Sequence, residues 1–288
     1  MGYLIGVDIG GSHISAGIIT ADGKDIAPGS EVRMPVNSLG SKEEILDLWA
    51  DCIKALGLSS DSRLGIAMPA PFDYENGISL MVEQGKYLAL YQVNVKSELS
   101  DRLGIPDKNI FFLNDAAAFL QGEAVAGGWD KQQHLMGLTF GTGLGGAFKS
   151  GALAEDGAVW SIPFKEGIAE DYLSTAFFKN WAKERFGKTE TGLKPLLDSS
   201  ETREATLEML AVFGRNLAEL IHMQTKIRKI EGIVLGGNIM KAADHFLPLV
   251  NKLLEERNIQ VEIRISRLGE KAAMIGAASI HHEQGKKK

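Results

Sequence analysis

The sequence predicts an α/β protein built from two related lobes, and three observations support this fold class. The chain has 288 residues, more than the roughly 100 to 200 residues of a typical domain. Hydrophobic residues make up 44% of it, with 33 Gly and only 8 Pro, as is typical of α/β proteins with many tight turns. The third observation is a pattern of strand, glycine turn and strand that occurs twice.

The first copy of this pattern surrounds Asp8-Ile9-Gly10-Gly11-Ser12, between apolar segments at 3–7 and 14–19. The second copy lies 131 positions later, where an apolar segment at 134–140 is followed by the glycine turn Gly141–Gly146. At this offset Leu4, Gly6, Gly10 and Ala16 fall on Leu135, Gly137, Gly141 and Ala147, and Asp8 falls on Thr139. Together with the shared pattern, these identities predict a duplicated supersecondary unit.

The remaining elements follow from helical periodicity and from apolar runs. Helices are expected at 42–56, 95–103, 116–126, 172–185, 203–226, 243–256 and 271–282, strands at 63–68, 110–113 and 232–235, and an extended loop at 69–93. The aromatic side chains of Trp49, Phe177, Phe178 and Trp181 fit core positions of these helices. Strands that alternate with helices indicate doubly wound sheets. We therefore expect an N-terminal lobe at 1–113 and a C-terminal lobe at 114–270, with a helix at about 271–288 that packs back on the N-terminal lobe.

Charge and cysteine content argue against several functional classes. The net charge is −6, and the only run of Lys is Lys286–Lys288, so nucleic acid is not the expected partner. Cys52 is the single cysteine, which excludes an intrachain disulfide and a zinc site of several thiolates. The N-terminus lacks the features of a signal peptide, and no apolar stretch reaches the ~18 residues of a membrane helix. We expect a cytoplasmic protein without membrane contact.

The two glycine turns are suited to phosphate binding, because glycine lets backbone N–H groups approach phosphate oxygens. Each turn alone could be only a tight hairpin, but two on related units could hold one phosphate chain from both sides. Gly141-x-Gly143-x-x-Gly146 also fits the dinucleotide fingerprint, with Glu166 about 20 residues further on. That motif opens a helix, whereas a strand is expected after Gly146, so a nicotinamide or flavin site is not predicted.

Two carboxylates that follow predicted strands are candidates for chemistry. Asp8 ends the first strand directly before a glycine turn, where Mg²⁺ beside a polyphosphate finds an oxygen ligand, usually through water. The alternative is an Asp that stabilises only its own turn. Asp115 follows the strand at 110–113 and precedes a helix, so its position fits both a general base and the N-cap of that helix. The residues alone do not decide between these two roles.

Four segments occur in the order and spacing of the ROK family of sugar kinases and sugar-responsive repressors, and the chain resembles this family from about Tyr3 to Ala278. They are Asp8–Ser12, Asn114–Glu123, Thr139–Gly146 and Val234–Asn238. The resemblance implies an actin-like ATPase fold, which is ribonuclease H-like and duplicated into two lobes. It implies an enzyme that transfers the γ-phosphate of ATP, with Mg²⁺, to a hydroxyl of a hexose or hexose derivative, O6 being the expected acceptor. A homodimer is implied as well.

Roles transfer from the family to matching positions of this sequence. The phosphate loops would be Gly10, Gly11 and Ser12, and Thr139, Gly141, Thr142 and Gly143, while Gly236 and Gly237 would lie by the adenosine. Asp8 would hold Mg²⁺ through water. Asn114 would hydrogen-bond the sugar, and Asp115 would take the proton from its primary hydroxyl. Glu170, in a segment that resembles the family, would be a further sugar contact.

The sequence departs from the family where Gly-Glu-x-Gly-His and a cysteine-rich zinc loop are usual. Alignment on Ile162-Pro163 puts Ala158 in place of the Glu, Trp160 in place of the second Gly and Ser161 in place of the His. Burying unpaired sugar hydroxyls is costly, so other residues replace these contacts or the substrate differs from free glucose. Replacement candidates are Glu83, Gln84 and Lys86 of the extended loop, whose polarity is also what any exposed loop shows.

Two competing hypotheses stay open. One is a catalytically weak or inactive ROK protein that binds sugar and regulates. Repressors of this family carry a DNA-binding helix-turn-helix ahead of the first phosphate loop, and because that loop starts at residue 8 here, we expect no such module. The other is a kinase for a small molecule that is not a sugar, since fold alone does not fix the substrate.

Overall fold

The structure, a computed structural model, describes residues 2–82, 85–129, 131–187 and 192–285. The chain divides into two compact units. The first unit comprises Met1–Lys131, Lys149–Asp156 and Arg267–Lys288, and the second comprises Gln132–Phe148 and Gly157–Ser266. The division therefore does not fall at 113/114: helix α3 (Asp115–Ala126) joins the first unit, because it packs along the C-terminal helix α9 (Lys271–Gly285).

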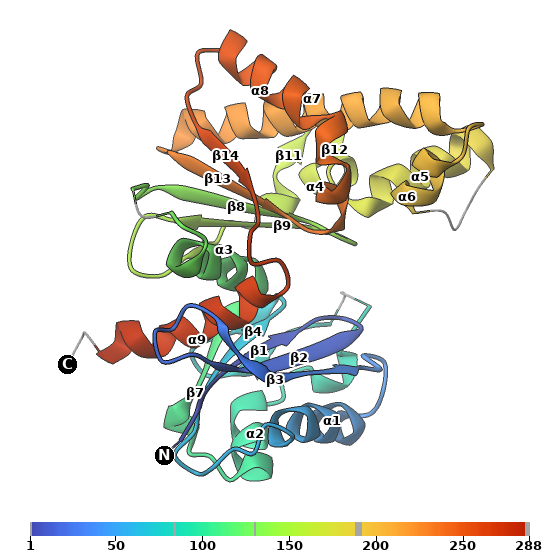
Figure 1. The fold of residues 1–288 in the computed structure, drawn as a ribbon. Coiled ribbons are helices and arrows are strands. Elements are labelled where there is room, and N and C mark those ends of the chain that lie inside the picture. Colours follow the sequence, from blue (N-terminus) through green and yellow to red (C-terminus); the bar gives the residue numbers. More distant parts are fainter. Residues whose placement is uncertain (1, 83–84, 130, 188–191, 286–288) are drawn as a thin grey trace. The chain divides into compact units, whose positions relative to one another are not determined.

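The first unit is built on a five-stranded sheet with the order β3-β2-β1-β4-β7. Its strands are β1 (Leu4–Ile9), β2 (His13–Ile19), β3 (Ile26–Pro35), β4 (Arg63–Met68) and β7 (Ile110–Asn114). β1 to β3 are antiparallel, and β4 and β7 run parallel to β1. Helices α1 (Lys42–Lys54) and α2 (Val95–Leu103) cover one face, and α3 and α9 cover the other (Figure 1). Short elements of this unit are β5 (Phe72–Asp73), β6 (Ile78–Ser79), η1 (Leu88–Leu90), η2 (Asp107–Asn109) and β10 (Glu155–Asp156).

Alternation along β1 explains both faces of this sheet. Ile5, Val7 and Ile9 are buried in the core beneath α1 and α2. On the opposite face the backbone of α9 comes so close that a Cβ at Gly6 would lie 2.2 Å from the carbonyl oxygen of Met274. Only glycine permits this approach, so the α9 face of β1 carries the apolar Leu4, then Gly6 without a side chain, and then Asp8.

The second unit is built on the strand order β9-β8-β13-β14. Its strands are β8 (Leu135–Phe140), β9 (Leu144–Lys149), β13 (Gly232–Gly236) and β14 (Glu262–Ile265), with the short β11 (Pro163–Phe164) and β12 (Gly167–Ile168). Its helices are η3 (Val159–Ser161), α4 (Ala169–Tyr172), α5 (Thr175–Phe186), α6 (Leu193–Asp198), α7 (Arg203–Ile227), η4 (Asn238–His245) and α8 (Leu247–Glu256). Phe213 of α7 centres the core, with ring centroids 5.1 to 5.5 Å from those of Phe140, Phe178 and Phe246.

The two sheets repeat one arrangement. β8 and β9 begin 131 residues after β1 and β2, the offset at which the sequence repeats. Each hairpin has a parallel strand beside its first strand, β4 beside β1 and β13 beside β8, so Asp8 and Thr139 take equivalent places. The helix expected from Ala243 instead begins at Leu247. Pro248 lies in its first turn, a position where proline favours the start of a helix. Within the described residues, no helix is both long and apolar enough to cross a bilayer.

Candidate active site

The carboxyl edge of the first unit's sheet carries both predicted carboxylates. Asp8 lies near the end of β1, and Asp115 directly follows β7. Both strands are parallel to β4, which lies between them, so the two side chains come to the same edge, the usual place for ligands in open α/β sheets. The charge of Asp115 contributes to a raised pKa of Asp8, which means that the two groups are near enough to interact.

The first glycine turn is anchored from the extended loop. The Tyr87 hydroxyl donates a hydrogen bond to the carbonyl oxygen of Gly10, although 77 positions separate them. Tyr87 is fully buried and meets Trp49 of α1 edge-on, with ring centroids 5.2 Å apart. Gly11 and Ser12 stay exposed. The hydrogen bond from Tyr87 therefore holds the base of the turn, while its tip is accessible to a ligand. Sequence reasoning missed Tyr87, because nothing local distinguishes it from other loop residues.

Lys86 lies beside the same turn. A Cβ added to Gly11 would be 3.4 Å from Cδ of Lys86, and the ammonium group acts on Asp115, whose pKa it pulls down against the opposing effect of burial. Of the three loop residues proposed to contact sugar, Lys86 is thus brought to the turn and to Asp115. Glu83 and Gln84 lie outside the described residues.

Asn114 is committed to protein contacts more than the family resemblance suggests. Asn114 is only 5% exposed to solvent. Its Oδ1 accepts a hydrogen bond from the N–H of Ala117 at 3.0 Å, so Asn114 is the N-cap of α3. Its Nδ2 donates to the Tyr74 hydroxyl at 3.2 Å, and that hydroxyl donates to the carbonyl oxygen of Met68 at 3.1 Å. One N–H of Asn114 remains for a ligand.

From the sequence, Asp115 could be either the N-cap of the following helix or a general base. In the structure the N-cap of α3 is Asn114. Oδ1 of Asp115 accepts a hydrogen bond from the N–H of Ala116 at 2.8 Å, while the residue stays exposed to solvent. Surrounding protein desolvates the carboxyl and raises its pKa, and Asp156 adds to the rise. A carboxyl group that is accessible but poorly solvated has the properties of a general base.

The pKa of Asp8 is strongly raised by its surroundings. Desolvation, followed by the carboxylates of Asp115 and Glu270, raises its pKa to about 7, while Arg33 opposes the rise. A hard cation takes carboxylate oxygens and would relieve this crowding of negative charge, so the site fits Mg²⁺. Within the described residues no group of three or more His, Cys, Asp or Glu side chains is placed to hold a metal. Asp8 is the residue that would hold Mg²⁺ here, through water, as the sequence predicts.

The second glycine turn is braced by Glu170. The N–H of Leu144 donates to Oε2 of Glu170 at 2.8 Å, and a Cβ at Gly143 would lie 2.4 Å from the same oxygen. The carbonyl oxygen of Gly141 accepts hydrogen bonds from the N–H and the hydroxyl of Thr175 at 2.9 and 2.6 Å. Glu170 thus shapes the turn that was predicted to bind phosphate, a role that sequence reasoning did not see.

Thr139, Gly236 and Gly237 meet at the carboxyl edge of the second sheet. Thr139 on β8 and Gly236 on β13 are partners in the ladder. Gly237 has φ of 91°, and a Cβ there would lie 2.3 Å from the carbonyl oxygen of Phe140, so the close approach requires glycine. Thr142 is exposed at the tip of the neighbouring turn. Thr139, Gly236 and Gly237 are thus neutral at the positions of this edge where the first unit carries Asp8.

The substituted family positions lie in a short helical turn of the second unit. Ala158 precedes η3 with φ of 45°, and the Ser161 hydroxyl donates back to the Ala158 carbonyl oxygen at 3.0 Å. Trp160 between them is 45% exposed. Neither Ala158 nor Ser161 can offer the carboxylate and imidazole that the family pattern has there, so this segment lacks both groups.

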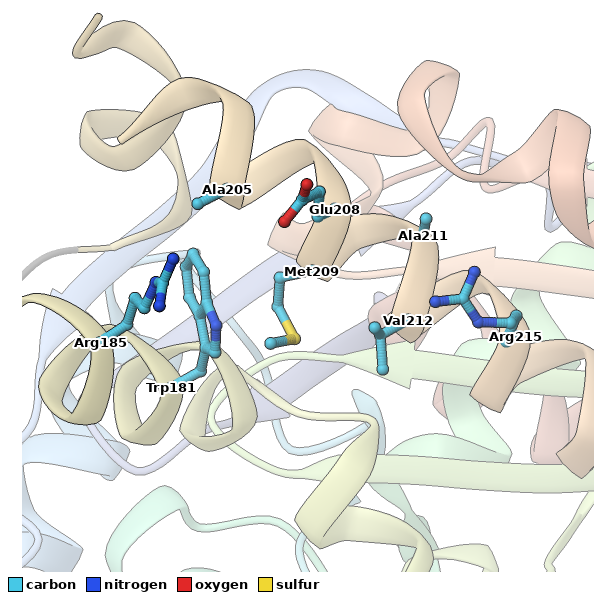
Figure 2. A pocket seen from close by; sticks show the side chains of 8 residues that line it. All are labelled: Trp181, Arg185, Ala205, Glu208, Met209, Ala211, Val212 and Arg215. Carbon is cyan, nitrogen blue, oxygen red and sulfur yellow. The ribbon is translucent and has the colours of Figure 1, made fainter. Parts of the chain in front are cut away.

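A recess of about 630 Å³ lies between α5 and α7, apart from every predicted site residue (Figure 2). Its lining is Trp181, Arg185, Ala205, Glu208, Met209, Ala211, Val212 and Arg215. Trp181, expected in the core, is instead half-buried on this surface, where it lies edge-on to Phe186 of the same helix with ring centroids 5.4 Å apart. Arg185, Glu208 and Arg215 form no ion pair with any described residue.

Comparisons with known proteins agree with this architecture. A ROK hexokinase from Thermus thermophilus, 20% identical in sequence, superposes with a TM-score of 0.78 over 99% of both chains. A ROK family glucokinase from Streptomyces griseus, solved in complex with glucose and AMPPNP, has a TM-score of 0.73 at 22% identity over 97% of this chain and 99% of its own. The chain has the two-lobe, actin-like ATPase fold of these proteins.

Sequence comparison then gives the family. The pattern of the ROK family matches residues 4–159 and 165–284, and the chain belongs to this family. Among curated relatives, the glucokinase of Thermotoga maritima is 28% identical, and the match covers 98% of each chain.

Proposed function

We propose that the protein is an ATP-dependent sugar kinase, which transfers the γ-phosphate to a hydroxyl of a hexose or hexose derivative, O6 being the expected acceptor. The observation that carries the proposal is Asp115, an accessible carboxyl with a raised pKa at the same sheet edge as Asp8 and an open glycine turn. Relatives named glucokinase, one solved with glucose and an ATP analogue, support the same class of substrates.

Each residue of the edge has a defined role in this reaction. Asp115 accepts the proton of the sugar hydroxyl as that oxygen forms a bond to the γ-phosphorus and the bond to the leaving ADP oxygen breaks. Its raised pKa brings it nearer to neutral pH, where proton transfer by a carboxylate is more effective. Lys86 opposes the rise and so favours the ionised form of Asp115. Mg²⁺, when bound by Asp8, neutralises charge on the phosphate oxygens.

The phosphates of ATP are proposed to bind at the two glycine turns, Gly10–Ser12 and Gly141–Gly143, with Thr139 beside the second. Exposed N–H groups at a turn without Cβ atoms donate to phosphate oxygens at no steric cost. Tyr87 and Glu170 hold these turns in shape before ATP arrives, and such preorganisation strengthens binding. Gly236 and Gly237 are proposed to border the adenosine.

The sugar is proposed to meet the remaining N–H of Asn114 and Oε1 of Glu170, the oxygen that does not brace the turn. Two hydroxyl contacts of the family pattern are absent at Ala158 and Ser161. A pocket that lacks a partner for a hydroxyl discriminates less against substrates modified there. We therefore expect hexose derivatives, including glycosides, to be accepted at least as well as free glucose.

A coupled ADP-release assay with Mg-ATP and a panel of hexoses, amino sugars and β-glucosides tests the proposal. Turnover is expected with at least one sugar, together with a loss of about 10²-fold or more in kcat for Asp115→Asn, the usual contribution of a general base. Asp101→Asn, an exposed substitution on α2, is the matched control and should keep full activity. Full activity of Asp115→Asn would refute the assigned base.

A sugar-binding regulator is the alternative that Ala158 and Ser161 favour. It predicts that sugars raise the melting temperature of the protein, by mass action, while no sugar releases ADP above the background rate. Melting curves on the same panel of sugars therefore separate binding from catalysis.

The recess on α5 and α7 is the proposed contact of a homodimer. In an isologous interface the same patch meets itself, and Arg185, Glu208 and Arg215, which form no ion pair with another described residue, offer both signs of charge for such a contact. Light scattering should give a dimer for the native chain and a monomer for Arg215→Glu. A dimer of unchanged strength in that variant would place the interface elsewhere.

A further inference from the structure

Arg33 lies in line with Asp8 across the first sheet. In the antiparallel ladders Asp8 is the partner of Ser15 on β2, and Ser15 is the partner of Arg33 on β3. Directly opposed residues point to the same face, and strands are spaced by about 4.8 Å. Arg33 therefore starts about two strand spacings from Asp8, on the face that carries the ligand edge. No family motif discussed above includes it.

The same residues enclose a recess. Its volume is about 160 Å³, several times the ~30 Å³ that a water molecule occupies in the liquid. The lining is Asp8, Gly10, Ser12, His13, Ser15, Arg33 and Glu270. Ser15 is 8% exposed and small, so the space above it stays open between Arg33 and the glycine turn. Arg33 thus lines the same recess as Gly10 and Ser12 of the turn that is proposed to receive phosphate.

The hydrogen bonds of Arg33 leave most of its donors available. Its Nη1 pairs with the Glu270 carboxylate, and within the described residues this is its only side-chain partner. A guanidinium has five N–H donors in a planar fork, so four remain. The Arg33 side chain is 46% exposed and that of Glu270 73% exposed, and ion pairs so open to solvent contribute little to folding. Stability alone does not account for a cation held here.

We propose that Arg33 is a phosphate-binding residue of the first loop, donating to the phosphate chain of ATP held at Gly10–Ser12, and that Glu270 is the positioning residue that aims the guanidinium into the recess before the nucleotide arrives. The planar fork of arginine matches two phosphate oxygens at once, which lysine cannot do. This inference rests on the proposed kinase function. It adds a second cation to the edge, since Lys86 reaches the turn from a different segment.

Binding of Mg-AMPPNP, measured by titration calorimetry, tests the proposal on Arg33→Met, Arg33→Lys and Glu270→Gln. Loss of charge-assisted hydrogen bonds should weaken binding by Arg33→Met about tenfold or more, with Arg33→Lys in between. KM for ATP should rise in parallel while KM for the sugar stays constant. Because Glu270 is proposed to position Arg33, Glu270→Gln should weaken binding less than Arg33→Met does. Arg63→Met, an exposed arginine at the opposite end of the same sheet, is the control.

The outcomes separate the two proposals. If the native chain binds Mg-AMPPNP and phosphorylates a sugar, but Arg33→Met binds the analogue like Arg63→Met, only the role of Arg33 is wrong. If Arg33→Met weakens adenosine as strongly as Mg-AMPPNP, its effect is structural and the phosphate contact is refuted. If the native chain binds no Mg-AMPPNP, the kinase proposal and the Arg33 proposal fail together.

Discussion

Replacing Asp8 with asparagine should stabilise the nucleotide-free protein in a pH-dependent way. Burial and the Asp115 and Glu270 carboxylates raise the pKa of Asp8 from 3.8 to about 7. The folded state thus binds a proton at this site more tightly than the unfolded chain, so the site's contribution to stability falls as pH rises from about 4 through 7. Between pH 5 and pH 8 the unfolded carboxyl is already ionised, whereas the folded one goes from protonated to mostly ionised. At ~1.4 kcal/mol per pH unit, wild type loses about 2.5 kcal/mol relative to Asp8→Asn over this interval.

Urea unfolding at pH 5 and pH 8 measures this difference. Hydrogen exchange of the β1 peptide should accompany it, because two units can unfold separately and then one midpoint does not describe the first unit. Asp115→Asn removes the second-largest cause of the raised pKa of Asp8, so the pH-dependent loss should shrink in that background. A gap between wild type and Asp8→Asn that is the same at both pH values would show that the carboxylates are not crowded as described.

Three further predictions follow from close contacts. Gly143→Ala puts a Cβ 2.4 Å from Oε2 of Glu170, which would disturb the brace on the second turn, and should raise KM for ATP several-fold; an unchanged KM for ATP would count against the brace. Gly276→Ala puts a Cβ 1.8 Å from the carbonyl oxygen of Ala118 and should cost about 3 kcal/mol or more in urea unfolding, whereas Gly151→Ala, with no atom within 4 Å, should change stability by less than about 0.5 kcal/mol. Cys52 is fully buried and burial raises its thiol pKa to about 11, so it should react with a thiol reagent only at the rate of unfolding, and rapid labelling of the native chain would contradict this.

Hydrophobic patterns within a few residues correctly predicted several strands and helices. The strand at 63–68 and the helix at 95–103 were predicted with the bounds that the structure has, because apolar alternation and helical periodicity act within a few residues. β3 was not predicted. It is an edge strand with Pro28 and Gly29 inside it and alternating exposure along its length, and edge strands tolerate residues that normally end a strand.

Long-range contacts were beyond sequence reasoning. Tyr87 hydrogen-bonds Gly10 from 77 positions away, and nothing in the sequence near either residue indicates that the two meet. Helix α3 was predicted, but its residues Ala116–Glu123 are buried all round, so no apolar stripe tells which neighbour it packs on. The assignment of α3 to the first unit comes instead from its contact with α9. The bond of Glu170 to the second turn likewise depends on tertiary placement.

The duplication also explains why the two turns differ. Both units place a residue at the same point of the same hairpin, Asp8 in one and Thr139 in the other. A carboxylate near a polyphosphate is tolerable where a cation lies between them, and repulsive where none does. Under the proposed function one copy needs an acidic position to hold Mg²⁺, and a second acidic position would only repel the phosphates. A neutral hydroxyl at Thr139 can donate a hydrogen bond instead. Catalytic acidity is therefore concentrated in the first unit, and the second keeps the same backbone for neutral phosphate binding.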